Sequence, residues 1–169
     1  MPATPERWVQ IDIARQCLTL FEGRQQIAVW PVSTALKGAG EQIDSGCTPR
    51  GEHRVRIKVG EACPTNTVFI GRRPTGEIYN EGLATQQAPR DWILSRIIWL
   101  TGTQPGNNRG GRCDTLRRYI YIHGCPDCEP IGVPLSHGCI RMRNDDVIEL
   151  FDLIEAGTRV QIIEHPVET

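Results

Sequence analysis

The amino-acid sequence predicts a mainly β domain with one or two short helices, one of them near the C-terminus. Apolar and polar residues alternate through the first third of the chain, which is the period of a half-buried strand. A later apolar run, residues 92–100, is rich in β-branched and aromatic side chains, which favour a strand. An apolar stripe with helical spacing follows near the end. With 169 residues, 39% of them hydrophobic, the chain can bury one core, so one domain is expected.

Four runs in the first part of the chain have the alternation of a strand. They are residues 9–13, 18–20, 27–32 and 55–59. Turn-forming glycine, serine, threonine and proline residues are frequent over 38–49, which predicts a loop between the third and fourth runs. The pattern is typical of a strand meander that continues after this loop.

The middle of the chain is less regular. Residues 60–90 are dense in glycine, proline and threonine, so irregular structure is expected there. The apolar run at 92–100 is predicted to be a strand, and 102–111 a flexible loop. Residues 119–123 are predicted to form a buried strand that ends at Gly124.

The last part of the chain predicts a helix and a final strand. Asn144 is expected to cap the helix, because its side chain can accept a hydrogen bond from a free N–H group of the first turn. The apolar stripe of this helix consists of Val147, Leu150, Phe151 and Ile154. Gly157 is expected to stop the stripe, and residues 158–164 to form the closing strand.

Composition and charge argue against several classes of partner. A formal net charge of −1 gives no field that would attract nucleic acid or an anionic membrane. The longest apolar stretch is interrupted by Arg96 and is far shorter than the roughly 20 residues that span a bilayer. No nucleic acid, membrane or obligate protein partner is therefore expected.

The compartment is predicted from the cysteines and the N-terminus. Seven cysteines are an odd number, which would leave an unpaired thiol in an oxidising compartment. The first residues lack the pattern of a secretory signal. Both observations favour the cytoplasm, and the periplasm is the alternative if an export signal is missing from this sequence.

Two short segments hold the residues with reactive chemistry, His123-Gly124 and 136–141. A free cysteine has a pKa of about 8.5 and is little ionised at pH 7. A histidine at the end of a neighbouring strand could take the proton of Cys139, which predicts a thiolate–imidazolium pair with a thiol pKa of roughly 3.5 to 7.5. Gly138 would let the backbone approach the substrate and direct N–H groups at an oxyanion. A backbone carbonyl at Gly124 could accept the other N–H of the imidazole.

These residues resemble the catalytic domain of the L,D-transpeptidase (YkuD-like) family. Its signature is a His-Gly at a strand end, then Ser/Thr-His-Gly-Cys, an aliphatic residue and Arg or Asn. By this resemblance, the catalytic histidine is His123, the backbone carbonyl belongs to Gly124 and the nucleophile is Cys139. The substrate-binding and oxyanion segment falls on Ser136, His137, Gly138 and Arg141.

The resemblance extends over about residues 8–164, because the segments 31–34 and 48–53 also look like those of the family. It implies a single β-sandwich domain over residues 1–169. In the second segment, His53 is expected to stabilise the fold rather than to react.

The resemblance also implies an acyl transfer on peptidoglycan stem peptides. Cys139 would attack the carbonyl of the third residue, a diamino acid, and form a thioester, while His123 protonates the departing D-alanine. Arg141 is expected to bind a substrate carboxylate. Water as acceptor gives an L,D-carboxypeptidase, and a second stem gives a 3–3 crosslink. A cytoplasmic location favours hydrolysis of recycled tetrapeptide to tripeptide. No metal or cofactor is implied.

Two other classes of function stay open. Cys125, Cys128, His137 and Cys139 could supply four ligands to a structural zinc ion, since C-x₂-C is the usual half of such a site. The chain could instead be an inactive murein-binding module that keeps the family's groove. Zinc analysis and acylation by a carbapenem would separate these classes from the enzyme.

Overall fold

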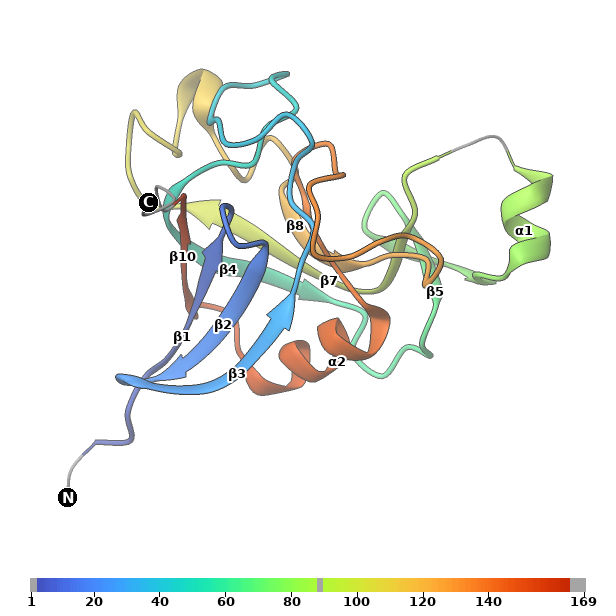
Figure 1. The fold of residues 1–169 in the computed structure, drawn as a ribbon, viewed down its shortest axis with the longest axis horizontal. Helices are drawn as coiled ribbons and strands as arrows, with labels where there is room; N and C mark the ends of the chain where they lie inside the picture. Colours follow the sequence, from blue (N-terminus) through green and yellow to red (C-terminus); the bar gives the residue numbers. More distant parts are fainter. Residues whose placement is uncertain (1–2, 88–89, 165–169) are drawn as a thin grey trace.

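Ten strands and two α-helices make up the computed structural model, which describes residues 3–87 and 90–164 (Figure 1). The strands are β1 Arg7–Asp12, β2 Cys17–Glu22, β3 Gln25–Pro31, β4 Gly51–Val59, β5 Thr67–Ile70, β6 Arg73–Ile78, β7 Ile93–Gly102, β8 Tyr121–Gly124, β9 Ile140–Met142 and β10 Arg159–Ile163. The helices are α1 Glu81–Gln86 and α2 Asn144–Leu153, with one 3₁₀ turn at Gly111–Cys113. The predicted mainly β class is confirmed, and the strands belong to one hydrogen-bonded sheet.

The sheet places the first and the last strand side by side. Its order is β3-β2-β1-β10-β4-β7-β5-β6, and β8 pairs with β7. The last strand, β10, lies between β1 and β4, parallel to the first and antiparallel to the second. At the other side, β9 pairs with β8 in parallel, and its Arg141 forms an isolated antiparallel bridge with Ser33. The short β8–β9 pair is where the two predicted active-site segments meet.

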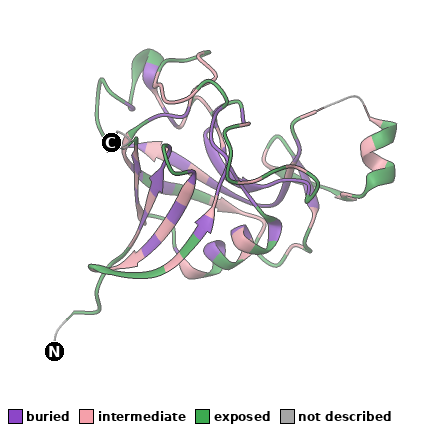
Figure 2. Cartoon of the chain, viewed as in Figure 1, coloured by how far each residue is buried: buried purple, intermediate pink, exposed green. Residues whose placement is uncertain are grey.

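The main core is enclosed by the curved sheet and α2. It combines apolar residues of β1 and β2 with those of β7, β8 and β9 (Figure 2). The helix packs on β7 and β8. The predicted helical stripe, Val147, Leu150, Phe151 and Ile154, is buried in this core. No helix in the described residues is long and apolar enough to cross a bilayer.

Asn144 does not cap α2, contrary to the prediction. Arg143 is the N-cap residue and makes no capping hydrogen bond through its side chain. The Asn144 side chain is buried instead, where its Nδ2 donates to Cys125 O at 2.9 Å and its Oδ1 accepts from Ser95 Oγ at 2.6 Å. The Asn144 side chain therefore joins β7 to the segment after β8 by hydrogen bonds. These bonds use Oδ1, the oxygen that would be needed to cap α2.

Residues 60–90 are more regular than predicted. β5 and β6 form a hairpin in which Ile70 pairs with Arg73, and the two residues between them, Gly71 and Arg72, have φ of +56° and +64°. Two positive φ values are typical of the tight turns that suit the twist of a hairpin. The short α1 follows, and Asn80 caps it by accepting from Leu83 N at 2.8 Å.

The loop 102–111 is tightly hydrogen-bonded rather than open. Asn108 is fully buried at its centre. Its Oδ1 accepts from Gln104 N at 2.9 Å and its Nδ2 donates to Glu52 O at 2.9 Å. One asparagine thus fixes the loop to the start of β4, a long-range contact that composition does not reveal.

Candidate active site

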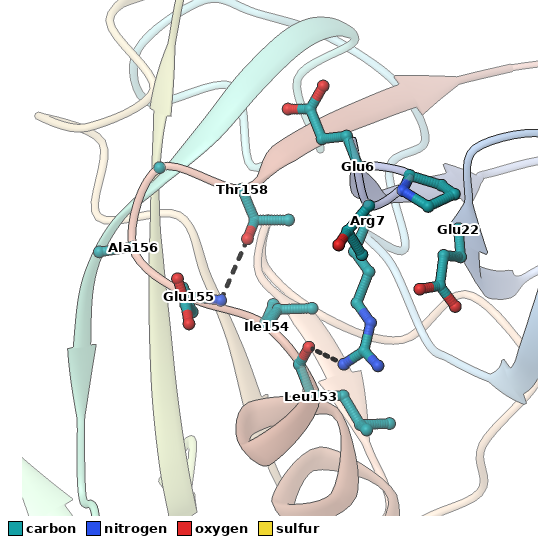
Figure 3. Close-up of a pocket in the computed structure, with 11 residues that line it drawn as sticks. Glu6, Arg7, Glu22, Leu153, Ile154, Glu155, Ala156 and Thr158 are labelled. Atoms are coloured by element: carbon teal, nitrogen blue, oxygen red, sulfur yellow. Dashed lines mark hydrogen bonds between the residues drawn. The ribbon is translucent and has the colours of Figure 1, made fainter. Parts of the chain in front are cut away.

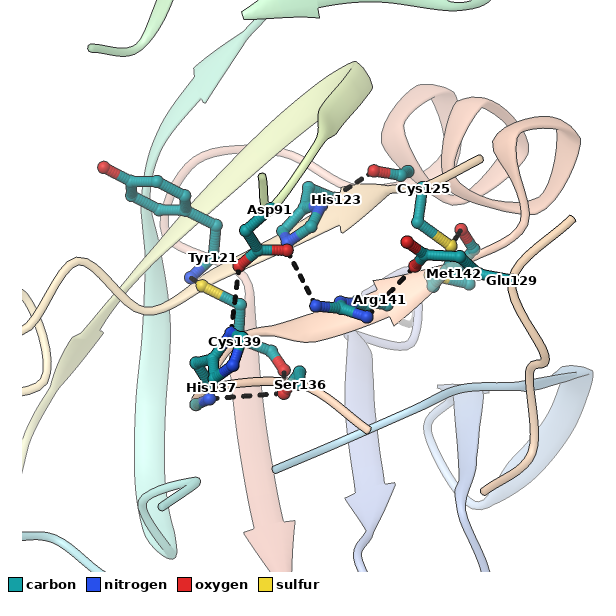
Figure 4. A network of polar contacts seen from close by, with 12 residues as sticks. Asp91, Tyr121, His123, Cys125, Glu129, Ser136, His137, Cys139, Arg141 and Met142 are labelled. Carbon is teal, nitrogen blue, oxygen red and sulfur yellow. Dashed lines mark hydrogen bonds and ion pairs between the residues drawn. The ribbon is translucent and has the colours of Figure 1, made fainter. Parts of the chain in front are cut away.

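The parallel pairing of β8 and β9 places the two sequence segments beside each other. His123 in β8 is in register with Arg141 in β9, and Cys139 comes immediately before β9. Figure 4 shows the side chains of His123, Cys139 and Arg141 gathered around this pair, with Asp91 among them. The register therefore brings together residues that the sequence separates by a loop.

The imidazole of His123 is held by its own strand end. Its Nδ1 lies 2.7 Å from Gly124 O, the contact expected from the sequence. Because a carbonyl can only accept, Nδ1 carries the proton and the neutral ring has Nε2 as its base. Nε2 is buried and has no hydrogen-bond partner in the described residues. Burial lowers the pKa of His123, against the opposing effects of Asp91 and the Gly124 carbonyl. The free ring is therefore a neutral base.

Only glycine fits at position 124. A Cβ there would lie 2.4 Å from Asn144 Oδ1 and 2.6 Å from Leu94 O. Both distances are far inside van der Waals contact, so a side chain would push β8 away from β7 or displace Asn144. Gly124 thus sets the position of the carbonyl that orients His123.

The thiol of Cys139 lies between two backbone groups. Its Sγ donates to Tyr119 O at 3.3 Å and accepts from Tyr121 N at 3.3 Å. Burial raises the pKa of this thiol to about 12, although the Tyr121 N–H and the cations Arg141 and Arg118 act in the lowering direction. The direction of this shift is opposite to that of the predicted low-pKa thiolate–imidazolium pair. A low-dielectric site favours the neutral thiol and the neutral imidazole over two charges.

Gly138 has a structural role that differs from the prediction. Its φ is +131°, and a Cβ would lie 3.2 Å from Cys47 O and from Ile120 Cδ1, so it is packed against protein rather than open to substrate. Its N–H donates to Ser136 Oγ at 3.2 Å, and the same oxygen donates to Cys139 O at 2.5 Å. The predicted oxyanion donor at Gly138 is thus already used. Ser136 instead shapes the turn that carries the cysteine.

Arg141 is already paired with two carboxylates. Its Nη2 donates to Asp91 Oδ1 at 2.7 Å and its Nη1 to Glu129 Oε2 at 3.0 Å. Only 8% of its side chain is exposed. The prediction that Arg141 binds a substrate carboxylate is therefore not supported, because a substrate would have to displace two internal anions. The residue fixes the segments before β7 and after β8 to β9.

Asp91 is the functional candidate that sequence reasoning missed. Besides Arg141, it lies 3.6 Å from Nδ1 of His137, whose side chain is 80% exposed. Its charge raises the pKa of both His123 and Cys139. Nothing in the local sequence marks it, except that it directly precedes the strand-forming run at 92–100. His137 itself makes no contact with His123 or Cys139 among the described hydrogen bonds and ion pairs.

The four residues considered for zinc are not gathered. Cys125 Sγ is buried against Met142 O, Cys128 is exposed, and Cys139 lies between two tyrosine backbones. Within residues 3–87 and 90–164, no three side chains of histidine, cysteine, aspartate or glutamate are placed to hold a metal ion. The geometry thus gives no support to a Cys₃His site.

Two hollows of similar size differ in position. One of about 490 Å³, lined by residues 4–7, Glu22 and 153–158, contains none of the predicted site residues (Figure 3). Arg7 there donates to Leu153 O, next to three glutamates. Another, of about 440 Å³, is lined by His137 and the segment 117–120, together with Ile43, Asp44 and Gly46. Cys139 is not in this lining, but its Sγ contacts the carbonyl of Tyr119, which is. The second hollow is therefore the one near Cys139.

A cysteine thiol beside a buried, oriented histidine is typical of enzymes with a cysteine nucleophile. The chain belongs to the L,D-transpeptidase catalytic domain family, whose model matches residues 6–162. YbiS of Escherichia coli, named a probable L,D-transpeptidase, is 42% identical over 169 residues, which is 99% of this chain and 48% of YbiS. ErfK/SrfK of Salmonella typhimurium is 47% identical over 129 residues, covering 71% and 41% of the two chains. The chain spans about half the length of these curated relatives.

Solved structures share the fold at low sequence identity. Bd1075 of Bdellovibrio bacteriovorus has a TM-score of 0.60 at 18% identity over 96% of this chain and 49% of the other. The L,D-transpeptidase LdtMt1, in complex with imipenem, has a TM-score of 0.56 at 18% identity over 94% and 59% of the two chains. These structures confirm the fold, and the family model and YbiS confirm the family resemblance identified from the sequence.

Proposed function

We propose that this chain cleaves peptidoglycan stem peptides through a thioester on Cys139 and releases D-alanine from the position after the third residue. The observation that carries the proposal is that the β8–β9 pairing brings a backbone-held thiol and a histidine to neighbouring strands, with Nε2 of the histidine unpartnered in the described residues. Membership of the L,D-transpeptidase family supports the substrate class.

The reaction starts from the neutral pair. His123 Nε2 removes the thiol proton as Sγ attacks the carbonyl carbon of the third residue, and the resulting imidazolium is stabilised by the charge of Asp91. The Cys139 N–H makes no hydrogen bond to another described residue, so it is our candidate oxyanion donor. Collapse of the intermediate breaks the C–N bond, and His123 returns its proton to the amine of D-alanine. The acyl group remains on sulfur.

We propose water as the acceptor and the cytoplasm as the compartment, which makes the chain an L,D-carboxypeptidase acting on recycled tetrapeptide. His123, neutral again, would deprotonate the water that attacks the thioester, giving tripeptide and free thiol. The seven cysteines are all free thiols in the structure, which suits a reducing compartment. Fractionation of cells that express the natural protein tests the compartment: activity confined to the periplasm would contradict it.

The decisive experiment incubates the protein with a soluble murein tetrapeptide, with and without tripeptide or a D-amino acid, and identifies products by mass spectrometry. Tripeptide and D-alanine in water alone support the carboxypeptidase. Dimer or exchanged peptide with little hydrolysis would make the chain a transpeptidase. Cys139→Ala and His123→Ala should each abolish D-alanine release while the circular dichroism spectrum is retained, and turnover by Cys139→Ala would overturn the mechanism.

A murein-binding module without activity is the remaining alternative. Because LdtMt1 forms a complex with imipenem, imipenem is a suitable probe of Cys139. A covalent adduct on Cys139, found by peptide mass mapping, supports the enzyme. No adduct and no D-alanine release, with the tetrapeptide still bound, would favour the binding module.

A further inference from the structure

The hollow of about 440 Å³ beside Cys139 has the chemistry of a carboxylate site. It is lined by Ile43, Asp44, Gly46, residues 117–120 and His137. Arg117 and Arg118 contribute two cations, and Asp44 is the single anion in the lining. Arg141 is neutralised by its own partners, whereas these two arginines line the hollow without an ion pair in the described residues.

Arg118 is fixed in place without a carboxylate partner. Its Nη1 donates to Gly40 O at 3.2 Å, and its Nη2 donates to Ser45 Oγ at 3.3 Å and Cys47 O at 2.6 Å. No ion pair to this side chain is present among the described residues. Backbone carbonyls and a hydroxyl do not neutralise the charge of Arg118. An arginine has five N–H donors, so these three hydrogen bonds leave donors free for a ligand.

The turn that carries the arginines is built rigidly. Asp114 accepts from Arg117 N at 2.9 Å and from Gly110 N at 2.7 Å, and Arg118 N donates to Asp114 O at 3.0 Å. Tyr119 then adopts a φ of +56°, which is uncommon for a residue with a side chain. In this conformation its carbonyl accepts from Cys139 Sγ. One turn therefore positions both the thiol and the two cations.

The lining of the hollow indicates which part of a peptide it takes. Ile43, Tyr119 and Ile120 give it apolar wall beside the arginines. A peptide end with a small apolar side chain and a free carboxylate matches this combination of apolar wall and cations, and the terminal D-alanine of the proposed substrate has both. Arg118 also acts on Cys139 electrostatically, in the direction that lowers its pKa, which places its charge near the sulfur.

We propose that this hollow binds the C-terminal residue of the substrate peptide, with Arg118 and Arg117 recognising its carboxylate. The inference rests on the proposed function, because it takes the substrate to be a peptide cut next to its last residue. An arginine pair gives charge-assisted hydrogen bonds, which are stronger than neutral ones. Recognition of this carboxylate would make the enzyme selective for tetrapeptides over chains that continue beyond the fourth residue.

The test measures binding without turnover. In Cys139→Ala protein, calorimetry compares a murein tetrapeptide with its C-terminal amide. We expect the acid to bind at least about tenfold more tightly, as charge-assisted hydrogen bonds imply. In the same background, Arg118→Gln or Arg117→Gln should reduce this preference severalfold. Arg56→Gln, an exposed arginine on β4 outside the hollow, is the charge-matched control and should keep it.

A substitution at Asp44 should have the opposite effect on binding of the acid. Asp44→Asn removes the anion of the lining and should strengthen binding of the acid severalfold while leaving the amide unchanged. Equal binding of acid and amide, no detectable binding of either, or a preference retained in both arginine variants would overturn the inference. D-alanine release by the unmodified protein is measured separately, so failure of the carboxylate site and failure of the proposed reaction give different results.

Discussion

Arg141 Nη2 lies 2.7 Å from Asp91 Oδ1, so the cation of the active-site motif is neutralised by a carboxylate that precedes β7. Glu129 pairs with the second terminal nitrogen at 3.0 Å. Arg141 therefore connects three segments of the chain, namely β9, the segment before β7 and the segment after β8.

Loss of this connection should be costly. Arg141→Gln leaves two carboxylates without a cation, and because each is about a third exposed, we expect a loss of about 2 kcal/mol, below that of a fully buried pair. Urea unfolding of Arg141→Gln, Asp91→Asn and the double variant measures the coupling, for which we expect about 1 kcal/mol. Strictly additive effects would show that the two side chains do not stabilise each other.

The thiol of the free protein should react slowly. Since burial raises the pKa of Cys139 to about 12, little thiolate is present at pH 7. We expect iodoacetamide to modify exposed Cys128 well before Cys139, with the rate at Cys139 still increasing above pH 9. Peptide mass mapping over time measures both sites in one sample. Rapid alkylation of Cys139 at pH 7 would contradict the raised pKa and support the thiolate–imidazolium pair predicted from the sequence.

The pH dependence of kcat/KM should report the protonation of the buried His123. Burial lowers the pKa of His123, so the acid limb of kcat/KM should lie below pH 6.5. Because the charge of Asp91 raises the pKa of His123, Asp91→Asn should move that limb to still lower pH and reduce the maximal rate. Initial rates of D-alanine release between pH 4 and 9 measure both. An unchanged acid limb of kcat/KM in Asp91→Asn would mean that Asp91 positions Arg141 but does not influence the pKa of His123.

His53 should make stability depend on pH. It is fully buried between Gly51 O and Thr115 Oγ1, and burial lowers its pKa from 6.5 to about 4. The unfolded chain binds the proton first, so stability is complete above pH 6.5 and falls as the pH drops to 4. The loss from this group is about 3 kcal/mol.

The control for His53 is a neutral variant. His53→Gln removes the titration and should show a shallower decline in unfolding free energy across the same interval, with the remainder due to His123 and the carboxylates. Urea unfolding at several pH values makes the comparison. Parallel pH curves for the two proteins would mean that His53 is solvated enough to titrate normally.

Local patterns predicted most of the strands and the contact of His123 with the Gly124 carbonyl because the relevant information lies within a few residues. Alternation depends on nearest neighbours, and His123-Gly124 holds its imidazole with the adjacent carbonyl. Asn144 and Arg141 behaved differently from expectation because their partners, Ser95 and Asp91, are distant in the sequence. The thiol pKa could not be predicted either, since it depends on how much water the folded chain excludes from Cys139.

The position of β10 has a consequence for how the molecule is made. Residues 159–163 occupy the gap between β1 and β4, so those two strands have no partner on their facing edges until residues 159–163 have left the ribosome. Pairings this distant in sequence close large loops and slow folding. Until then the nascent chain exposes open strand edges, which are sites of aggregation. A chain that stops before residue 159 would thus form a sheet that is split between β1 and β4.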